Sequence, residues 1–252
     1  MKNHFVFSYY GNKRNECDEI FDVIQNKLNG IDTIIEPYCG SSAFSYYMSQ
    51  KYPKRFKYIL NDNNSLLIEL YNLIKNGTKD EHDKFIDDLN ESIIDLDKSI
   101  YDDIKKQNSL IGFIITHSIY TIRPGNYRDS PRKKFDNFFD APIVKFLKDE
   151  DVTISNLNGE IIYDTYKNND KCLIFLDPPY IIESFNYHGD SDVGIYKRFE
   201  NEKIDTFSSY IVLCLGNNFI IRLLFKDYIR KIYDKKYGSN RKVEHVIISN
   251  KI

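Results

Sequence analysis

An acid, two prolines and an aromatic residue directly follow the apolar run 173–176, as Asp177, Pro178, Pro179 and Tyr180. One reaction that these groups could assist is attack by an aromatic amine, such as the amino group of a nucleobase. An aromatic amine is a poor nucleophile because its lone pair is delocalised into the ring. Asp177 and the carbonyl oxygen of Pro178 can each accept one amino hydrogen, which directs the lone pair towards an electrophile. Proline holds that carbonyl in place, and Tyr180 offers a stacking surface for an extruded base. A stiff turn with a buried tyrosine would leave the acid unexplained, so we interpret these four residues as catalytic.

Two further strand ends carry groups suited to a nucleoside. Glu36, Pro37, Tyr38 and Gly40 form a tight turn that opens the next helix, where Gly40 lets a ligand approach the backbone. Asp62 ends the next strand and is placed to accept both ribose hydroxyls, although a strand-end Asp is more often a helix cap. Because the dinucleotide pattern GxGxxG is absent, a smaller adenosyl ligand fits better, and S-adenosylmethionine would supply an electrophilic methyl group.

Alternating strands and helices are expected to position these groups. Apolar periodicity predicts an α/β protein, in which ligands bind outside the carboxyl ends of the strands. Residues 78–150 interrupt this pattern with helical stretches rich in Asp and Lys. We therefore predict one open Rossmann-like sheet over residues 1–77 and 151–252, with a mainly helical insertion over 78–150. The predicted strands are 32–40, 56–63, 152–157, 172–178, 210–216 and 243–249, and the clearest helices are 18–28 and 65–77.

The composition excludes several classes of protein. The 252 residues are ample for a hydrophobic core, and the net charge of −2 means that any nucleic-acid surface must be local. The four cysteines form no CxxC pair and have no histidine at metal-ligand spacing, so we expect buried free thiols and no metal. No apolar run reaches the roughly 18 residues of a membrane span, and the N-terminal residues lack a signal-peptide core. We therefore expect a cytoplasmic protein that does not bind membranes.

The predicted insertion carries a basic loop over residues 121–135, in which five basic residues face one acid. A solvated charged loop is the usual interpretation of such a run, but the position between Asp62 and the catalytic segment favours DNA binding. One bidentate arginine, for which we favour Arg123, would read a base in the major groove, and lysines would contact phosphates. The candidate DNA-binding residues are Arg123, Asn126, Arg128, Arg132, Lys133 and Lys134.

These motifs together resemble those of Dam-type DNA adenine-N6 methyltransferases of the alpha subclass, especially compact phage members, over nearly the whole chain. Tyr9, Gly11 and Lys13 are similar to the family's N-terminal motif (Y/W)-x-G-x-K, and residues 240–250 resemble its closing hairpin. The resemblance implies site-specific methyl transfer from S-adenosylmethionine to an adenine extruded from double-stranded DNA. The candidate cofactor-binding residues are Tyr9, Gly11, Asn12, Lys13, Glu36, Pro37, Tyr38, Gly40, Asp62 and Asp177.

Other functions remain open at this point. The same chemistry could act on RNA, and a non-catalytic protein of this fold could bind nucleic acid or cofactor. The second alternative fits a turn in which Gly40 is the only glycine, where the family usually has two or three, and the lack of an Asp-Phe pair at 156–160. Glutamine methylation on proteins uses Asn-Pro-Pro-Tyr, so Asp177 argues against it. The sequence does not define the recognised DNA site or say whether a restriction enzyme accompanies the protein.

Overall fold

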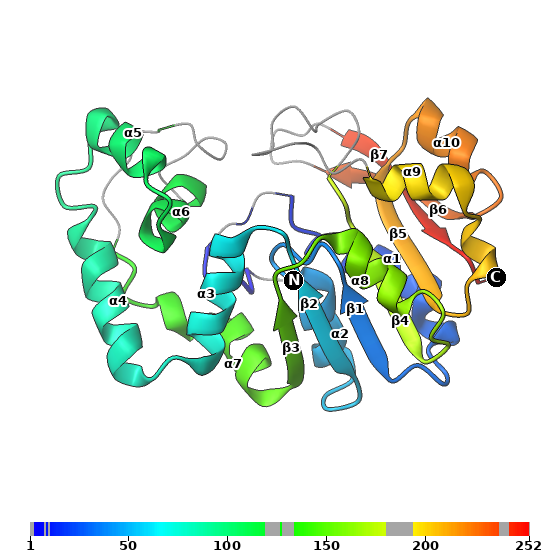
Figure 1. Cartoon of the computed structure of the whole chain (residues 1–252), viewed down its shortest axis with the longest axis horizontal. Helices are drawn as coiled ribbons and strands as arrows, with labels where there is room; N and C mark the ends of the chain where they lie inside the picture. The colour runs from blue at the N-terminus through cyan, green and yellow to red at the C-terminus, as the bar shows by residue number, and fades with distance from the viewer. Residues whose placement is uncertain are drawn as a thin grey trace.

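A seven-stranded sheet forms the centre of the molecule (Figure 1). The computed structural model describes residues 3–7, 9, 11–118, 127, 134–179, 194–236 and 242–251. Within them the strand order is β3-β2-β1-β4-β5-β7-β6. The chain moves outward in one direction from β1 to β3 and in the other from β4 onward, so the order reverses between β1 and β4. In open α/β sheets this reversal is where ligands bind.

The strands from β1 to β5 pair in parallel, whereas β7 runs antiparallel to both of its neighbours, β5 and β6. All five residues of β4 are buried, as expected for a central strand covered on both faces. The strands are β1 (Thr33–Glu36), β2 (Lys57–Asn61), β3 (Asp151–Ser155), β4 (Cys172–Leu176), β5 (Tyr210–Gly216), β6 (Ile229–Lys236) and β7 (Lys242–Ser249).

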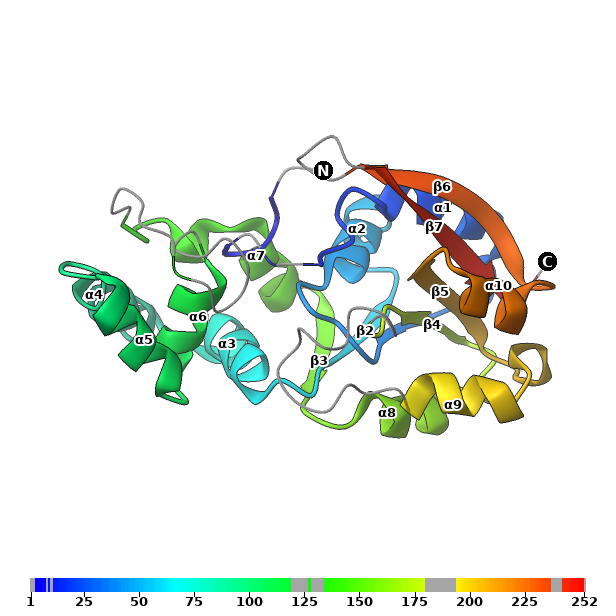
Figure 2. The same cartoon turned by 90° about the horizontal axis from the view of Figure 1, so that it is seen from above.

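Helices cover both faces of the sheet, as the view from above shows (Figure 2). Successive side chains of a strand point to opposite faces, so Ile34 joins one buried cluster and Ile35 the other. The first face is covered by α1 (Cys17–Ile24), α2 (Ala43–Lys51) and α7 (Pro142–Asp149). The second is covered by α8 (Gly159–Tyr166), α9 (Gly194–Asn201) and α10 (Phe219–Phe225). Short 3-10 helices are found at Gln25–Lys27, Phe138–Asp140 and Ile204–Thr206.

A group of helices extends to one side of the sheet (Figure 1). The long α3 packs against α6 on one side and against α7 on the other, so it joins this group to the sheet. The next helix starts with a capping box, in which Thr78 and Glu81 bond each other's backbone N–H groups. These helices are α3 (Ser65–Asn76), α4 (Lys79–Glu91), α5 (Lys98–Lys106) and α6 (Leu110–His117).

The predicted fold class is confirmed, because each predicted strand is found within a few residues of its expected bounds. The sequence did not predict β6, which lies at the edge of the sheet and in which five of the eight residues are charged. The assignment of residues 78–150 to a separate DNA-binding insertion stays a prediction. In the described part of the chain, no helix is long and apolar enough to cross a membrane.

Candidate active site

The carboxyl ends of three neighbouring strands bring predicted site residues together. β1 lies between β2 and β4. Glu36 at the end of β1, Asp62 just after β2 and Asp177 just after β4 therefore share one edge of the sheet. Lys13, from the segment before α1, reaches the same edge because it pairs with Asp177. Three groups chosen from the sequence on chemical grounds, and a fourth chosen by family resemblance, are thus neighbours in space.

Gly40 adopts a left-handed conformation in the turn after β1, with φ at +48°. Its N–H donates to Asp62 Oδ2 at 3.0 Å, and its carbonyl accepts from the Tyr71 hydroxyl at 2.7 Å. A Cβ added at Gly40 would lie 3.3 Å from Cε1 of Tyr9. The turn therefore requires glycine both for its backbone conformation and for the close approach of the Tyr9 ring.

Ser42 also lies in the left-handed region, with φ at +50°, which costs a residue with a side chain about 1–2 kcal/mol. Its N–H donates to the carbonyl of Cys39 at 2.7 Å, and its hydroxyl lies 2.9 Å from that of Tyr71. Both bonds favour the strained conformation. The turn therefore adopts its left-handed conformation at Ser42 without a second glycine. This weakens the argument that a turn with one glycine indicates a non-catalytic protein.

Asp62 is not the cap of α3, which was the alternative interpretation from the sequence. Asn64 caps that helix, since its side chain accepts the N–H groups of Leu66 and Leu67. Asp62 accepts the N–H groups of Gly40 and Asn64, one on each carboxylate oxygen and both at 3.0 Å, and a backbone hydrogen bond from Asn63 also acts on its carboxyl. Burial raises its pKa above the usual value. A carboxylate has about four lone-pair sites, so Asp62 keeps capacity for a further donor such as a ribose hydroxyl.

The neighbouring Asn61 has a structural role. It is fully buried, and its Nδ2 donates to the carbonyls of Pro37 and Leu157 at 2.9 Å each. Its Oδ1 accepts from the Ser155 hydroxyl at 2.8 Å and from the N–H of Leu157 at 2.9 Å. One side chain thus joins the ends of β1, β2 and β3. Pro37, a predicted cofactor-contact residue, belongs to this frame through its carbonyl.

Glu36 is buried beneath the turn, and its Oε1 accepts the N–H of Ser45 in the first turn of α2 at 2.8 Å. Burial raises the pKa of Glu36 to about 8, against the opposing effect of its hydrogen bonds with Ser45. The carboxyl is therefore mainly protonated at neutral pH. It orients α2 under the turn without adding a full negative charge to the site.

Asp177 forms a close ion pair with Lys13, whose Nζ lies 2.5 Å from Oδ1. The Lys13 side chain is almost fully buried, while that of Asp177 is 18% exposed. Burial raises the pKa of Asp177 above its usual value, although Lys13 opposes this effect. A carboxylate that is held by one ammonium group and still partly open can accept a further hydrogen bond.

The two prolines after Asp177 continue this rigid strand end. Pro178 is buried, and the carbonyl of Pro179 accepts the hydroxyl of Tyr196 on α9 at 3.3 Å. Tyr196 is itself buried, so it anchors the backbone just beyond Pro178. Tyr180, predicted to stack on the target base, lies outside the described residues.

The N-terminal motif is folded into a local turn. Asn12 Nδ2 donates to the carbonyl of Tyr9 at 2.6 Å, and Asn12 Oδ1 accepts the N–H of Arg14 at 3.2 Å. Gly11 is exposed and left-handed, with φ at +77°. Asn12 therefore shapes the backbone that presents Lys13, and Lys13 is the member of the motif that contacts Asp177.

Tyr38 and Leu157 lie near the ends of β1 and β3. The ring of Tyr38 lies so close to Gly159 that a Cβ there would come within 2.5 Å of it, so the start of α8 packs on Tyr38. Leu157, in the segment where the sequence lacks an Asp-Phe pair, is 45% exposed just beyond β3. An exposed apolar side chain therefore lies at this edge of the sheet.

With this geometry described, the chain can be compared with known proteins. Residues 9–114 match the D12 class N6 adenine-specific DNA methyltransferases. The chain is also 23% identical to the Type II methyltransferase M.CviBI of Paramecium bursaria Chlorella virus NC1A, over 97% of this chain and 98% of that one. The resemblance predicted from the sequence is thereby confirmed, and these matches support DNA adenine-N6 methylation as the activity.

Two solved structures were also found. One is the catalytic domain of human METTL16 with a MAT2A 3′UTR hairpin, at a TM-score of 0.39 and 8% identity, covering 97% of this chain and 72% of that one. The other is the N-terminal domain of human METTL16 with SAH, at a TM-score of 0.37 and 9% identity, covering 93% and 68%.

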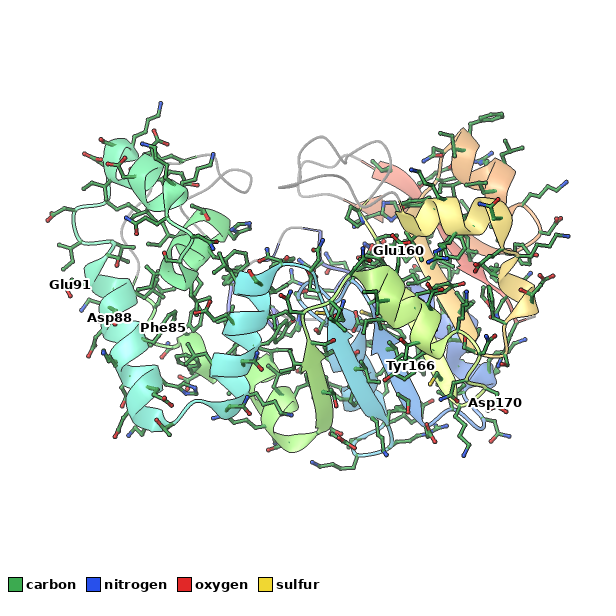
Figure 3. The ribbon with its side chains drawn as sticks, viewed as in Figure 1. Phe85, Asp88, Glu91, Glu160, Tyr166 and Asp170 are labelled. Atoms are coloured by element: carbon green, nitrogen blue, oxygen red, sulfur yellow. The ribbon has the colours of Figure 1, made fainter. Side chains whose placement is uncertain are left out.

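Most of the predicted DNA-binding residues lie outside the described residues, namely Arg123, Asn126, Arg128, Arg132 and Lys133. Lys134 is described and exposed. The nearby helix α4 carries six acidic residues and two lysines, and its Asp88 and Glu91 project from its outer side (Figure 3). Phosphates would be repelled by this face.

Two aromatic residues of the basic loop have structural roles. The Tyr127 hydroxyl donates to the carbonyl of Leu96 at 3.4 Å, and its ring lies 5.2 Å from that of the buried Tyr101. Phe135 packs on the same buried cluster, and its N–H donates to Asn90 Oδ1 at 2.8 Å. These contacts hold the two residues against the helices.

The sequence did not identify a buried polar cluster beside Lys13. Glu16, Cys214 and His245 come within 4.8 Å of one another through their potential ligand atoms, although they are distant in the sequence. The four cysteines are free and buried as predicted. The signal available in the sequence was His245, a polar residue directly before the buried apolar run 246–248. Spacing along the chain could not reveal partners that only the sheet brings together.

Proposed function

We propose that this protein transfers the methyl group of S-adenosylmethionine to the N6 amino group of an adenine extruded from double-stranded DNA. The observation that carries the proposal is the shared edge of β1, β2 and β4, where a left-handed glycine turn, a carboxylate with spare acceptor capacity and the Asp177 strand end lie together. Bound S-adenosylmethionine would supply a methyl group on a positively charged sulfur.

The cofactor's parts have matching partners along this edge. Asp62 would accept the ribose hydroxyls with the acceptor capacity that its backbone donors leave. Leu157 would lie against the adenine ring. The methionine end would lie near Gly40 and Lys13, in agreement with the family resemblance. The residues present therefore fit the cofactor, although Asp177 and Lys13 already satisfy part of each other's charge.

Asp177 and the carbonyl of Pro178 would orient the acceptor. Each would take a hydrogen bond from the N6 amino group, so that the nitrogen lone pair points at the methyl carbon. The new nitrogen–carbon bond forms as the carbon–sulfur bond breaks, and the amino group then loses one proton. Because proline and the Tyr196 contact at Pro179 fix the backbone, these acceptors need no rearrangement during the reaction.

Incubation with radiolabelled S-adenosylmethionine and unmethylated AT-rich duplex DNA, followed by nucleoside analysis, tests this proposal. We expect label in N6-methyladenine. A parallel reaction with structured RNA separates the RNA alternative, since label in RNA alone would refute a DNA enzyme. Cofactor binding by calorimetry without label in any nucleic acid would instead identify a non-catalytic binding protein. The recognised site would follow from mapping the methylated positions, and any partner restriction enzyme from cleavage at the same site.

A further inference from the structure

A buried carboxylate lies behind the pair of Lys13 and Asp177. Glu16, at the start of α1, is 1% exposed. Its Oε1 lies 2.5 Å from Nζ of Lys235. Its Oε2 lies 2.9 Å from Nδ1 of His245 and accepts the Tyr233 hydroxyl. These three partners come from the hairpin of β6 and β7, so one side chain of α1 gathers the polar groups of the last two strands.

The same residue is tied to Lys13. The N–H of Glu16 donates to the carbonyl of Lys13 at 2.8 Å, and the Cys17 thiol donates to that carbonyl at 3.3 Å. Burial opposes ionisation of Glu16, but Lys13, His245 and Lys235 hold its pKa below the usual range. The ammonium group of Lys13 is therefore attracted by two carboxylates, directly by Asp177 and at longer range by Glu16.

We propose that Glu16 is a positioning residue for methyl transfer, which through Lys13 sets how strongly Asp177 accepts a hydrogen bond from the target amino group. The proposal rests on the proposed function. If Lys13 were balanced by Asp177 alone, it would draw more of that carboxylate's charge and leave a weaker acceptor. Glu16 shares the ammonium group and so keeps Asp177 available to the substrate.

The charges around Asp177 give this proposal a definite sign. Burial has the largest effect on the pKa of Asp177 and raises it. Among the described residues, Glu16 raises this pKa further, whereas Lys13 and Lys235 lower it. Removal of the Glu16 charge should therefore lower that pKa, and removal of the Lys235 charge should raise it. The other titratable groups that face this region are Glu36, Tyr196, Cys214, Tyr233 and His245.

A metal ion is the other use for such a cluster, because Glu16, Cys214 and His245 could offer one ligand each. The ammonium group of Lys235 already contacts the Glu16 carboxylate. Burial raises the pKa of Cys214 well above its usual value, which disfavours the thiolate that a metal needs. The local charge is thus compensated by protein cations, and we favour the positioning role.

The test compares Glu16→Gln with Lys235→Met in single-turnover methyl transfer to duplex DNA across a pH series. Glu16→Gln should slow transfer about tenfold, a loss of about 1.4 kcal/mol of transition-state stabilisation, with little change in cofactor affinity. In a plot of transfer rate against pH, the acid limb is the low-pH side, where the rate falls as Asp177 becomes protonated. This limb should move to lower pH in Glu16→Gln and to higher pH in Lys235→Met. A role limited to attaching the hairpin would change stability in both variants and move neither limb.

Lys231→Met is the matched control. Lys231 also joins β6 to α1, since its Nζ lies 2.6 Å from Glu19 Oε2 and 3.0 Å from Asp22 Oδ2. It faces neither Lys13 nor Asp177, so this variant should lower the melting temperature without moving the acid limb. A shift of the limb in Lys231→Met equal to that in Glu16→Gln would overturn the proposal.

A second measurement does not depend on turnover. Carbon-13 labelling of the aspartate carboxyls, with the Asp177 signal assigned by Asp177→Asn, would follow the titration of this group by NMR in the full chain. We expect its pKa to fall in Glu16→Gln and to rise in Lys235→Met. Unchanged titration in both variants would overturn the proposal. Absence of methyl transfer by the wild-type protein, with these opposite shifts present, would instead refute only the proposed function.

Discussion

The carboxylate of Asp62 accepts the backbone N–H of Gly40, which lies 22 residues earlier in the chain, at 3.0 Å. This bond joins the turn after β1 to the end of β2, so the two features that suggested a nucleoside from the sequence are one structural unit. Asn64 provides the cap of α3, which leaves Asp62 without a need to serve that helix. The relation therefore favours a ligand for Asp62 over the capping role.

Asp62→Ala should weaken S-adenosylmethionine binding at least tenfold, or about 1.4 kcal/mol, because charge-assisted hydrogen bonds to the ribose are worth about that much each. Calorimetry with S-adenosylhomocysteine would measure the change. The control is Asn64→Ala, which removes the actual helix cap and should cost about 1 kcal/mol of unfolding free energy with cofactor affinity preserved. Equal losses of affinity in the two variants would mean that Asp62 acts only by shaping this turn.

Asp177→Ala should abolish measurable methyl transfer while DNA affinity stays close to that of the wild type, because the acid acts mainly where charge changes in the transition state. Asp177→Asn should keep a small residual rate, since an amide oxygen still accepts one hydrogen bond. Single-turnover rates and fluorescence binding titrations would measure the two effects. An alanine variant that retained a tenth of the rate would contradict the mechanism.

Glu36→Gln should make stability less dependent on pH. The folded pKa of Glu36 is about 8 against an ordinary value of 4.5, so folding favours the protonated form. That contribution is fully present below about pH 4.5 and is lost as the pH rises towards 8, at up to about 1.4 kcal/mol per pH unit. Glutamine mimics the protonated form at every pH. Urea unfolding at several pH values should therefore show that the free energy of unfolding of the variant rises relative to that of the wild type as the pH increases. Parallel plots of unfolding free energy against pH would refute the raised pKa.

Lys134→Ala should weaken binding to every DNA duplex alike and reduce the slope of log affinity against log salt by about one unit, because a phosphate contact carries no sequence information. The matched control is Lys84→Ala, an exposed lysine on the acidic helix α4 that should leave binding unchanged.

From the sequence alone, Arg123→Ala should cost about 1–3 kcal/mol of binding free energy at the cognate site and little on scrambled DNA. Uniform loss on both duplexes would make Arg123 a phosphate contact.

Much of the fold could be predicted because the physics that specifies it is local. The run 172–176 is apolar at every position, which is typical of a buried parallel strand, and glycine at position 77 and Asn64 mark the ends of α3. β6 was missed because five of its eight residues are charged and no strand alternation is visible, which also fits an exposed segment. Its assignment depends on pairing with β7, and such pairing cannot be seen within a short window.

The site was predictable where chemistry restricts the residue type and not where distant segments meet. Asp177 followed by two prolines has few structural explanations, so it could be identified without coordinates. Lys13 was selected by family resemblance, whereas its contact with Asp177 required the fold. Glu16 could not be found, because an acid at the start of a helix is common and its partners lie on strands near the other end of the chain.

The bond between Tyr233 and Glu16 spans 217 residues of chain, and this separation bears on how the protein is made. A ribosome releases the Lys13 segment long before β6 and β7, so the nascent chain carries a Glu16 carboxylate whose hairpin partners have not yet been synthesised. Burial of that charge before the hairpin arrives would be costly. The surroundings of Glu16 are therefore complete only when the last strands have been synthesised.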